Sequence, residues 1–208
     1  MAYIYFNIGA DFLMNDVYDS AIKYLHLAKY LNDSINIERM KVPLIQNLSY
    51  AYINSDYIAE AKPLIEEFIA IGEERRNNEI LARAYSHMSI FQRATNHPME
   101  AIKYAQKGLQ IETGELNIRL SLYLHLSEAY EDAGWYKESL ELWKKYDAID
   151  DSLYNIESTG TIAEIEAKYQ NEKKEKEIAI QNSKIDLLEK DNKLKRFGPI
   201  YCYSGSYY

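Results

Sequence analysis

Residues 123–143, YLHLSEAYEDAGWYKESLELW, contain the pattern that decides the fold of this chain. Tyr123, Leu126 and Tyr130 recur at spacings of three and four, which places them on one face of a helix. Gly134 then favours a turn, and a second helix follows it. The stretch therefore predicts two helices joined by a short turn.

The same pattern occurs four times along the chain, at intervals of about 40 residues. The equivalent positions are large at Tyr5, Ile45, Tyr85 and Tyr123, large again at Ile8, Leu48, Met88 and Leu126, small at Gly9, Ser49, Ser89 and Ser127, turn-forming at Asp16, Asp56, Asn96 and Gly134, and small at Ala21, Ala61, Ala101 and Ser139. Small residues let two helices approach closely. An ordinary helical bundle, which is the alternative, has no reason to repeat its small residues in phase.

These positions resemble the tetratricopeptide repeat signature, over about residues 2–152. The resemblance implies an all-α chain folded as a right-handed superhelix of four helix hairpins, at about 2–38, 42–78, 82–116 and 120–154, in an array spanning 1–156. The closing proline of the signature is replaced at Asp33, Glu73, Thr113 and Asp151, and the repeats exceed the usual length of about 34 residues. Longer second helices are expected to explain both departures.

A fifth first-helix pattern, at Ile162, Ile165 and Tyr169, predicts a capping helix that continues to residue 196 as a helix rich in Glu and Lys. Residues 157–196 form this region, and residues 197–208 are expected to be an irregular tail. Ile178 and Ile185 recur at seven residues with Leu188 in the alternate slot, which predicts a short coiled-coil seam and a homodimer. The alternative is a solvated connector.

Composition excludes several classes of function. The net charge of −8 disfavours nucleic acid, and Cys202, the single cysteine, cannot form an intrachain disulfide. No apolar run is long enough for a membrane span and no export signal is visible, so the chain is expected to be soluble as written. The histidines lack metal-site spacing and no phosphate loop is present, so we expect no enzyme, no metal and no cofactor.

A repeat array offers a concave surface lined mainly by its first helices, where a protein or peptide segment is expected to bind. The predicted groove residues are Tyr3, Phe6, Asn7, Leu13, Met14, Gln46, Asn47, Tyr50, Asn54, Arg83, His87, Arg93, His125 and Glu128. Asn47, Arg83 and His87 are expected to receive an acidic group through charge-assisted hydrogen bonds. The alternative for Arg83 is an ion pair with Glu79 on its own helix.

The resemblance also bears on that polar patch. Tetratricopeptide domains that hold the carboxylate end of a chaperone use five polar or basic residues, and Asn47, Arg83 and His87 match three of those positions. Phe6 and Ala10 occupy the other two. The resemblance therefore implies an incomplete carboxylate clamp.

Repeats followed by such a Glu/Lys-rich helix are similar to the sensory halves of membrane-tethered regulators from Bacteroides-type bacteria. This similarity implies a sensory or scaffolding part of a signalling or transcription regulator carrying a histidine kinase or DNA-binding module, periplasmic or membrane-tethered in a longer protein. Met1 falls inside the first predicted helix, so the chain is expected to be a fragment. The alternatives are a free-standing adaptor and a peptide-controlled regulator of a phosphorelay enzyme.

Overall fold

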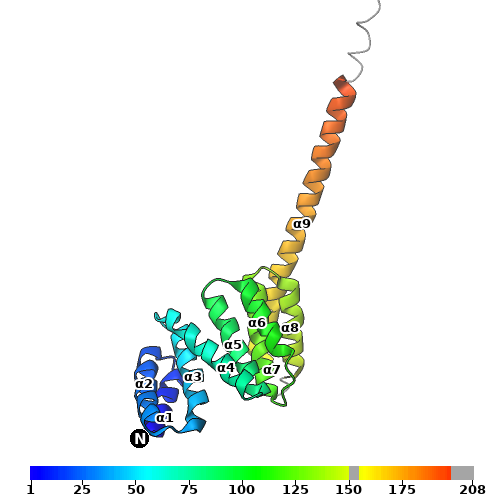
Figure 1. Ribbon diagram of the computed structural model, residues 1–208. Helices are drawn as coiled ribbons and strands as arrows, with labels where there is room; N and C mark the ends of the chain where they lie inside the picture. The colour runs from blue at the N-terminus through cyan, green and yellow to red at the C-terminus, as the bar shows by residue number, and fades with distance from the viewer. Residues whose placement is uncertain (150–154, 198–208) are drawn as a thin grey trace, which may run out of the picture.

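The computed structural model of the chain describes residues 1–149 and 155–197, and this described part contains helices and no β-strand (Figure 1). The helices are α1 (Ala2–Met14), α2 (Tyr18–Ile35), α3 (Glu38–Ile53), the short 3-10 helix η1 (Ile58–Glu60), α4 (Ala61–Glu74), α5 (Asn78–Ala94), α6 (Pro98–Leu109), α7 (Leu116–Asp132), α8 (Tyr136–Ile149) and α9 (Asn155–Phe197). Helices α1 to α8 form four hairpins that stack side by side as a right-handed superhelix. The predicted fold class is confirmed.

Small residues stand where the helices come closest. Ala21, Ala61, Ala101 and Ser139 are all 0% exposed, which confirms the repeat register. A methyl group added at Gly9 would lie 2.7 Å from Cγ of Leu25, and one added at Gly108 would lie 2.6 Å from Cδ2 of Leu122. These distances are too short for carbon atoms, so the hairpins can only pack this tightly with small side chains at these positions.

Three of the four predicted turns have a left-handed residue in the same place. Asp16, Asn96 and Gly134 have φ angles of 55°, 63° and 75°. The next residue of each turn donates its backbone N–H to a carbonyl five residues earlier: Val17 to Phe12 (2.9 Å), His97 to Gln92 (2.8 Å) and Trp135 to Tyr130 (2.7 Å). This arrangement satisfies carbonyls at the helix end. Asp56 is the exception, because η1 follows it instead.

The extra length of the repeats lies in the first helices, so the expectation of longer second helices is wrong for the last three hairpins. Helices α3, α5 and α7 have 16, 17 and 17 residues, whereas α4, α6 and α8 have 14, 12 and 14. The three first helices begin at Glu38, Asn78 and Leu116, one turn before the predicted starts at 42, 82 and 120. The added turns bury Met40 and Ile118, each 2% exposed, which stabilises them.

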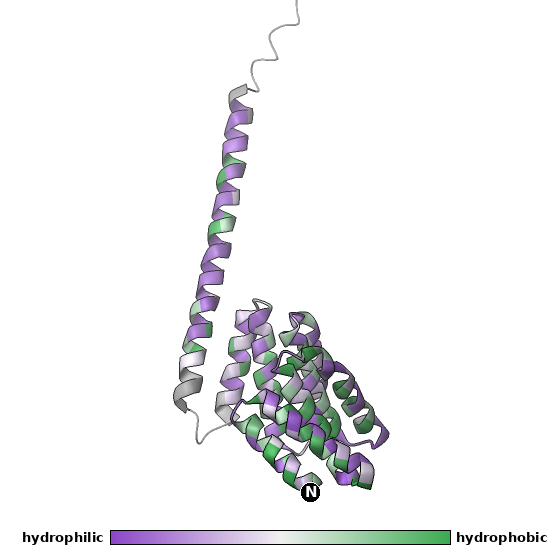
Figure 2. Cartoon of the chain, turned by 90° about the vertical axis from the view of Figure 1, so that its left-hand side faces the viewer, coloured by the Kyte–Doolittle hydropathy of each residue, from purple (hydrophilic) through white to green (hydrophobic). Residues whose placement is uncertain are grey.

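Helix α9 packs on the fourth hairpin and then continues beyond it (Figure 1). Ile165 is 0% exposed, and Lys168 forms an ion pair of 3.5 Å with Glu131 of α7. Lys173 occupies the position equivalent to Gly134, 39 residues earlier, and a lysine does not favour the left-handed φ of that turn. The helix continues through this position and extends over 43 residues as a largely hydrophilic rod (Figure 2).

Replacing Gly134 with alanine should lower the free energy of unfolding by about 1–2 kcal/mol, because its φ of 75° is strained for any residue with a Cβ. No atom lies within 4 Å of the added methyl, so the change tests the backbone angle alone. Gly114→Ala is the matched control: that site is equally open but has no positive φ, so no loss is expected. Urea denaturation measures both, and equal stabilities of the two variants would contradict the turn assignment.

Candidate functional site

Helices α1, α3, α5 and α7 lie next to one another and form what we call the first-helix surface. The predicted groove residues differ in their exposure on it. Exposed side chains are Tyr3, Asn7, Met14, Tyr50 and Asn54; half-buried ones are Phe6, Leu13, Gln46, Asn47, Arg83, Arg93, His125 and Glu128; and His87 is buried. The ring of Tyr50 on α3 contacts that of His87 on α5, and Arg93 on α5 forms an ion pair with Glu128 on α7.

Tyr3 is held in place by a residue that sequence reasoning missed. Nε of Arg39, in the added first turn of α3, donates a hydrogen bond to Oη of Tyr3. The guanidinium carbon of Arg39 also lies 5.3 Å from the centre of the tyrosine ring, within reach of a cation–π interaction. The sequence did not predict this contact, because the apolar positions alone place the start of the helix after Arg39.

His87 is an interior residue, so its expected role as a cation on the surface is wrong. Its Nδ1 lies 2.9 Å from Oγ of Ser49, and its ring meets those of Phe68 and Tyr50 edge-on. The Ser49 hydroxyl donates to the carbonyl of Gln46 and can therefore accept from a neutral imidazole. Burial, with smaller contributions from His125 and Arg83, lowers the pKa of His87 to about 3. The side chain is neutral at physiological pH.

Arg93 is the centre of an ion-pair cluster between α5 and α7. Its Nη1 pairs with Oε2 of Glu128, and its Nε donates to Oδ2 of Asp132 at 2.8 Å. Nδ1 of His125 lies 3.2 Å from the same Glu128 oxygen. Arg93 is therefore neutralised by two carboxylates, and an incoming acidic group would meet their repulsion.

The cluster continues along the first-helix surface as a chain of hydrogen bonds. Nε2 of His125 lies 3.2 Å from the Ser121 hydroxyl, which lies 3.4 Å from that of Ser86 on α5. Burial raises the pKa of Glu128, but its hydrogen bond to His125 and the charge of Arg93 outweigh burial and lower it overall. Glu128 is consequently held as a carboxylate.

Arg83 differs from Arg93 in having no carboxylate partner within the described part of the chain. Among the ion pairs of residues 1–149 and 155–197, none includes Arg83, so the alternative pairing with Glu79 is absent there. The side chain is half-buried on α5, and Asn47 is half-buried on the neighbouring α3. The two ends of α5 therefore differ in charge. Arg83, near its start, has no ion-pair partner among the described residues, whereas the charge of Arg93, near its end, is neutralised by carboxylates.

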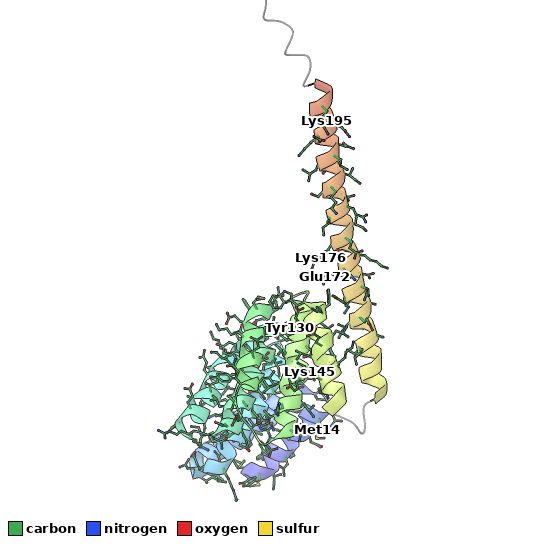
Figure 3. The ribbon with its side chains drawn as sticks, turned by 90° about the vertical axis from the view of Figure 1, so that its right-hand side faces the viewer. Met14, Tyr130, Lys145, Glu172, Lys176 and Lys195 are labelled. Atoms are coloured by element: carbon green, nitrogen blue, oxygen red, sulfur yellow. The ribbon has the colours of Figure 1, made fainter. Side chains whose placement is uncertain are left out.

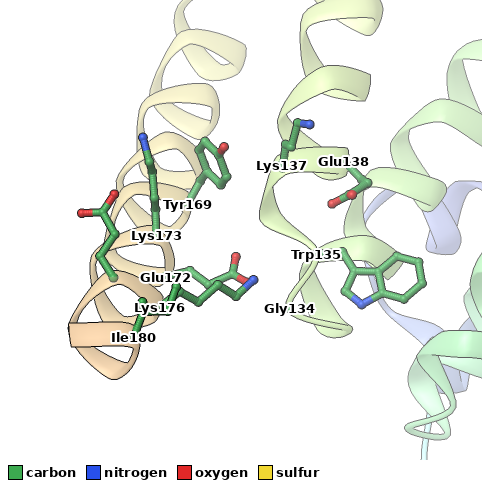
Figure 4. Close-up of a pocket in the computed structure, with 10 residues that line it drawn as sticks. Gly134, Trp135, Lys137, Glu138, Tyr169, Glu172, Lys173, Lys176 and Ile180 are labelled. Atoms are coloured by element: carbon green, nitrogen blue, oxygen red, sulfur yellow. The ribbon is translucent and has the colours of Figure 1, made fainter. Parts of the chain in front are cut away.

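The structure also contains a cleft that was not predicted from the sequence. A cleft of about 510 Å³ separates the start of α8 from α9 (Figure 4). Its lining residues are Gly134, Trp135, Lys137, Glu138, Tyr169, Glu172, Lys173, Lys176, Glu177 and Ile180. Trp135 stacks on Tyr130 with ring centres 5.7 Å apart. Glu172 and Lys176, which line this cleft, lie where α9 leaves the array (Figure 3).

Two further properties of the described residues limit the chemistry. They include no group of three or more His, Cys, Asp or Glu side chains placed to hold a metal ion. None of the helices in this part of the chain combines the length and apolar character needed to cross a membrane.

Similar solved structures are helical repeats. TPR-like repeats assigned to a kinesin light chain of Podosopora anserina match with a TM-score of 0.62 and 18% identity, over 88% of this chain and 94% of that one. A variant of that protein matches with a TM-score of 0.62 and 17% identity, over 92% and 95%. The fold is that of a tetratricopeptide-like array. The MamA protein also matches, with a TM-score of 0.51 and 18% identity over 94% of each chain. No protein-family model and no curated sequence matches significantly.

The buried His87 predicts how the stability of the tetratricopeptide-like array depends on pH. Its pKa is about 3 in the folded chain and about 6.5 in the unfolded chain, so only the unfolded chain gains a proton as the pH falls from 6.5. The free energy of unfolding that the neutral His87 contributes is therefore complete above pH 6.5. It declines by about 1.4 kcal/mol per pH unit between pH 6.5 and the folded pKa of about 3.

Urea denaturation at pH 7, 6 and 5 measures this decline. In His87→Gln the decline should be shallower, and the stability difference from the parent chain should shrink as the pH falls. His97→Gln, which changes an exposed histidine, is the control and should keep the parent slope. Parallel stability curves for the parent and His87→Gln would contradict the buried, neutral assignment.

Proposed function

We propose that the chain binds a segment of a partner protein along its first-helix surface. The observation that carries this proposal is the set of exposed side chains on neighbouring first helices, notably Tyr3, Met14 and Tyr50. Met14 is 85% exposed and Tyr50 is 37% exposed, so neither serves mainly to build the core. Exposed aromatic and methionine side chains are suited to contacts with a partner.

The charge distribution suggests how such a segment would lie. An acidic group would be placed beside Arg83 and Asn47, away from the carboxylates that surround Arg93. Arg83 has no ion-pair partner among the described residues, so its full charge is available to the ligand. Met14 and Leu13, at the other end of the surface, would receive apolar side chains. The surface would therefore select an extended segment with one acidic and one apolar anchor.

The wider role we propose is that of a sensory or scaffolding part of a bacterial signalling or transcription regulator. The long α9, which leaves the array as one continuous helix, supports this role because such a helix can carry a change in the array to whatever adjoins it. A free-standing adaptor is the second candidate, and regulation of a phosphorelay enzyme is a third. A membrane span and an effector module encoded by the same gene would select the first.

Changing Arg83 to alanine should weaken the binding of an acidic peptide by about 1.5–3 kcal/mol, the usual range for a hydrogen bond to a charged group. A peptide array would supply the ligand, and calorimetric titration would measure its affinity. Lys144→Ala, which removes the same charge from an exposed position on α8, should leave the affinity unchanged. Because His87 stays neutral, it should contribute no pH dependence to the affinity between pH 6 and 8, and His87→Gln should leave the pH profile unchanged. Equal affinities of the Arg83→Ala and Lys144→Ala variants for every bound peptide would overturn the ligand-binding role of Arg83.

We also propose that the protein is a homodimer joined through Ile178, Ile185 and Leu188. These three apolar side chains of α9 are 56%, 53% and 63% exposed. Burying them against a second copy would remove this apolar surface from water. The heptad spacing gives six seam positions, at 178, 181, 185, 188, 192 and 195. Only the three named residues are apolar, so the dimer should dissociate on dilution.

Sedimentation of the full chain should show a monomer–dimer equilibrium that Ile178→Glu combined with Ile185→Glu abolishes. The matched control combines Ile180→Glu with Leu187→Glu, which changes two similarly exposed residues of the same helix, at 57% and 63%, on a different face. The control should still dimerise. A full chain that remains monomeric up to about 1 mM, a weak-affinity limit, would leave α9 as a connector.

A further inference from the structure

Helix α9 carries two rows of exposed apolar residues on nearly opposite faces. The inner row, Ile180 and Leu187, continues the face that packs on the array, because Ile180 lies eleven residues, or about three turns, after Tyr169. Ile180 also lines the cleft beside α8. In the outer row, Ile178 and Ile185 point away from the array, because they lie nine and sixteen residues, or about two and a half and four and a half turns, after Tyr169, and Leu188 lies at the edge of this row.

The position of the array decides which row can join two copies of α9 side by side. The array lies on the inner side of α9, where Ile165 is fully buried. Two paired helices are about 8–10 Å apart, which is no more than the diameter of one helix. Parallel pairing through the inner row would require both arrays to fit into that gap. The outer row has no such obstruction, because each array would then lie outside the pair.

Charge and polarity distinguish a parallel from an antiparallel pair. With Ile178, Ile185 and Asn192 as equivalent seam positions, Lys184 and Glu189 flank the seam. In a parallel pair each Lys184 faces Glu189 of the second copy, whereas an antiparallel pair does not match these positions. Neither residue forms an ion pair within the described part of its own chain, although the nearby Lys195 pairs with Asp191. Asn192 would also meet its own copy, and a buried asparagine pair of this kind sets the register.

Resting on the homodimer proposed above, we infer that two copies of α9 pair in parallel and in register through the outer row, with the two arrays on opposite outer sides. Each copy contributes the segment beyond Lys173, where every described side chain is exposed. The arrangement leaves the first-helix surfaces of both copies free. A partner that carries two copies of the bound segment would then gain affinity through simultaneous binding.

Disulfide capture in the full chain tests the orientation. In a Cys202→Ser background, Asn192→Cys places two cysteines side by side only if the helices are parallel and in register. Ser183→Cys, on the opposite face of the same helix, is the matched control. Under mild oxidation, Asn192→Cys should cross-link at least tenfold faster than Ser183→Cys, as measured on non-reducing gels.

The outcomes separate the orientation from the dimer itself. A chain that sediments as a dimer but does not cross-link through Asn192→Cys would overturn the parallel arrangement while sparing the dimer. Preferential cross-linking through Ser183→Cys would assign the seam to the inner row instead. A chain that sediments as a monomer and cross-links at neither site would overturn both.

Charge reversal provides a second measurement of the register. Lys184→Glu and Glu189→Lys should each weaken the dimer severalfold, because each change places like charges opposite one another twice in the symmetric pair. Mixing the two variants should recover dimerisation as a heterodimer, since both flanking pairs are then complementary. Dimer strength that is insensitive to either change would contradict the in-register pairing of Lys184 with Glu189.

Discussion

Every hairpin of this protein depends on a close approach between helices that only small side chains permit. Ala21, Ala61 and Ala101 are 0% exposed, and added methyl groups at Gly9 and Gly72 would lie 2.7 Å and 2.9 Å from atoms of the facing helix. A densely packed interior cannot absorb an extra carbon at such distances without displacing a neighbour. Gly9 faces Leu25 within one hairpin, whereas Gly72 faces Leu81 of the next hairpin, so close contacts of this kind occur both within hairpins and between them.

The regular stacking also creates the polar features of the first-helix surface. First helices that run side by side in the same direction bring corresponding ends together, so Arg93 near the end of α5 meets Glu128 and Asp132 near the end of α7. The same arrangement buries His87 between α3, α4 and α5, against Ser49 and Phe68. The ion pairs of Arg93 and the burial of His87 thus require side chains from neighbouring repeats, and neither feature could form within a single hairpin.

Helix α9 shows what happens when one element of the repeat is missing. Its first part packs like the first helix of a fifth hairpin, but Lys173 stands at the position of the turn residue and the helix continues to Phe197. The continuation leaves a cleft against α8 and exposes apolar residues such as Ile178 and Ile180 that have no partner in the described chain. In the described part of the chain, α9 therefore projects from the array as a rod instead of closing a fifth hairpin.

The sequence by itself determined the helix pairs, their register and the left-handed turns at Asp16, Asn96 and Gly134, because helical periodicity, small contacts and turn chemistry are local properties. It also predicted that these first helices lie side by side, which they do. Only the tertiary structure decided that His87 is buried and neutral, that Arg93 is neutralised while Arg83 has no such partner, and that a cleft opens beside α9. Burial and ion pairing depend on side chains brought together from different helices, about 35 to 40 residues apart in the chain, and periodicity within one helix contains no record of them.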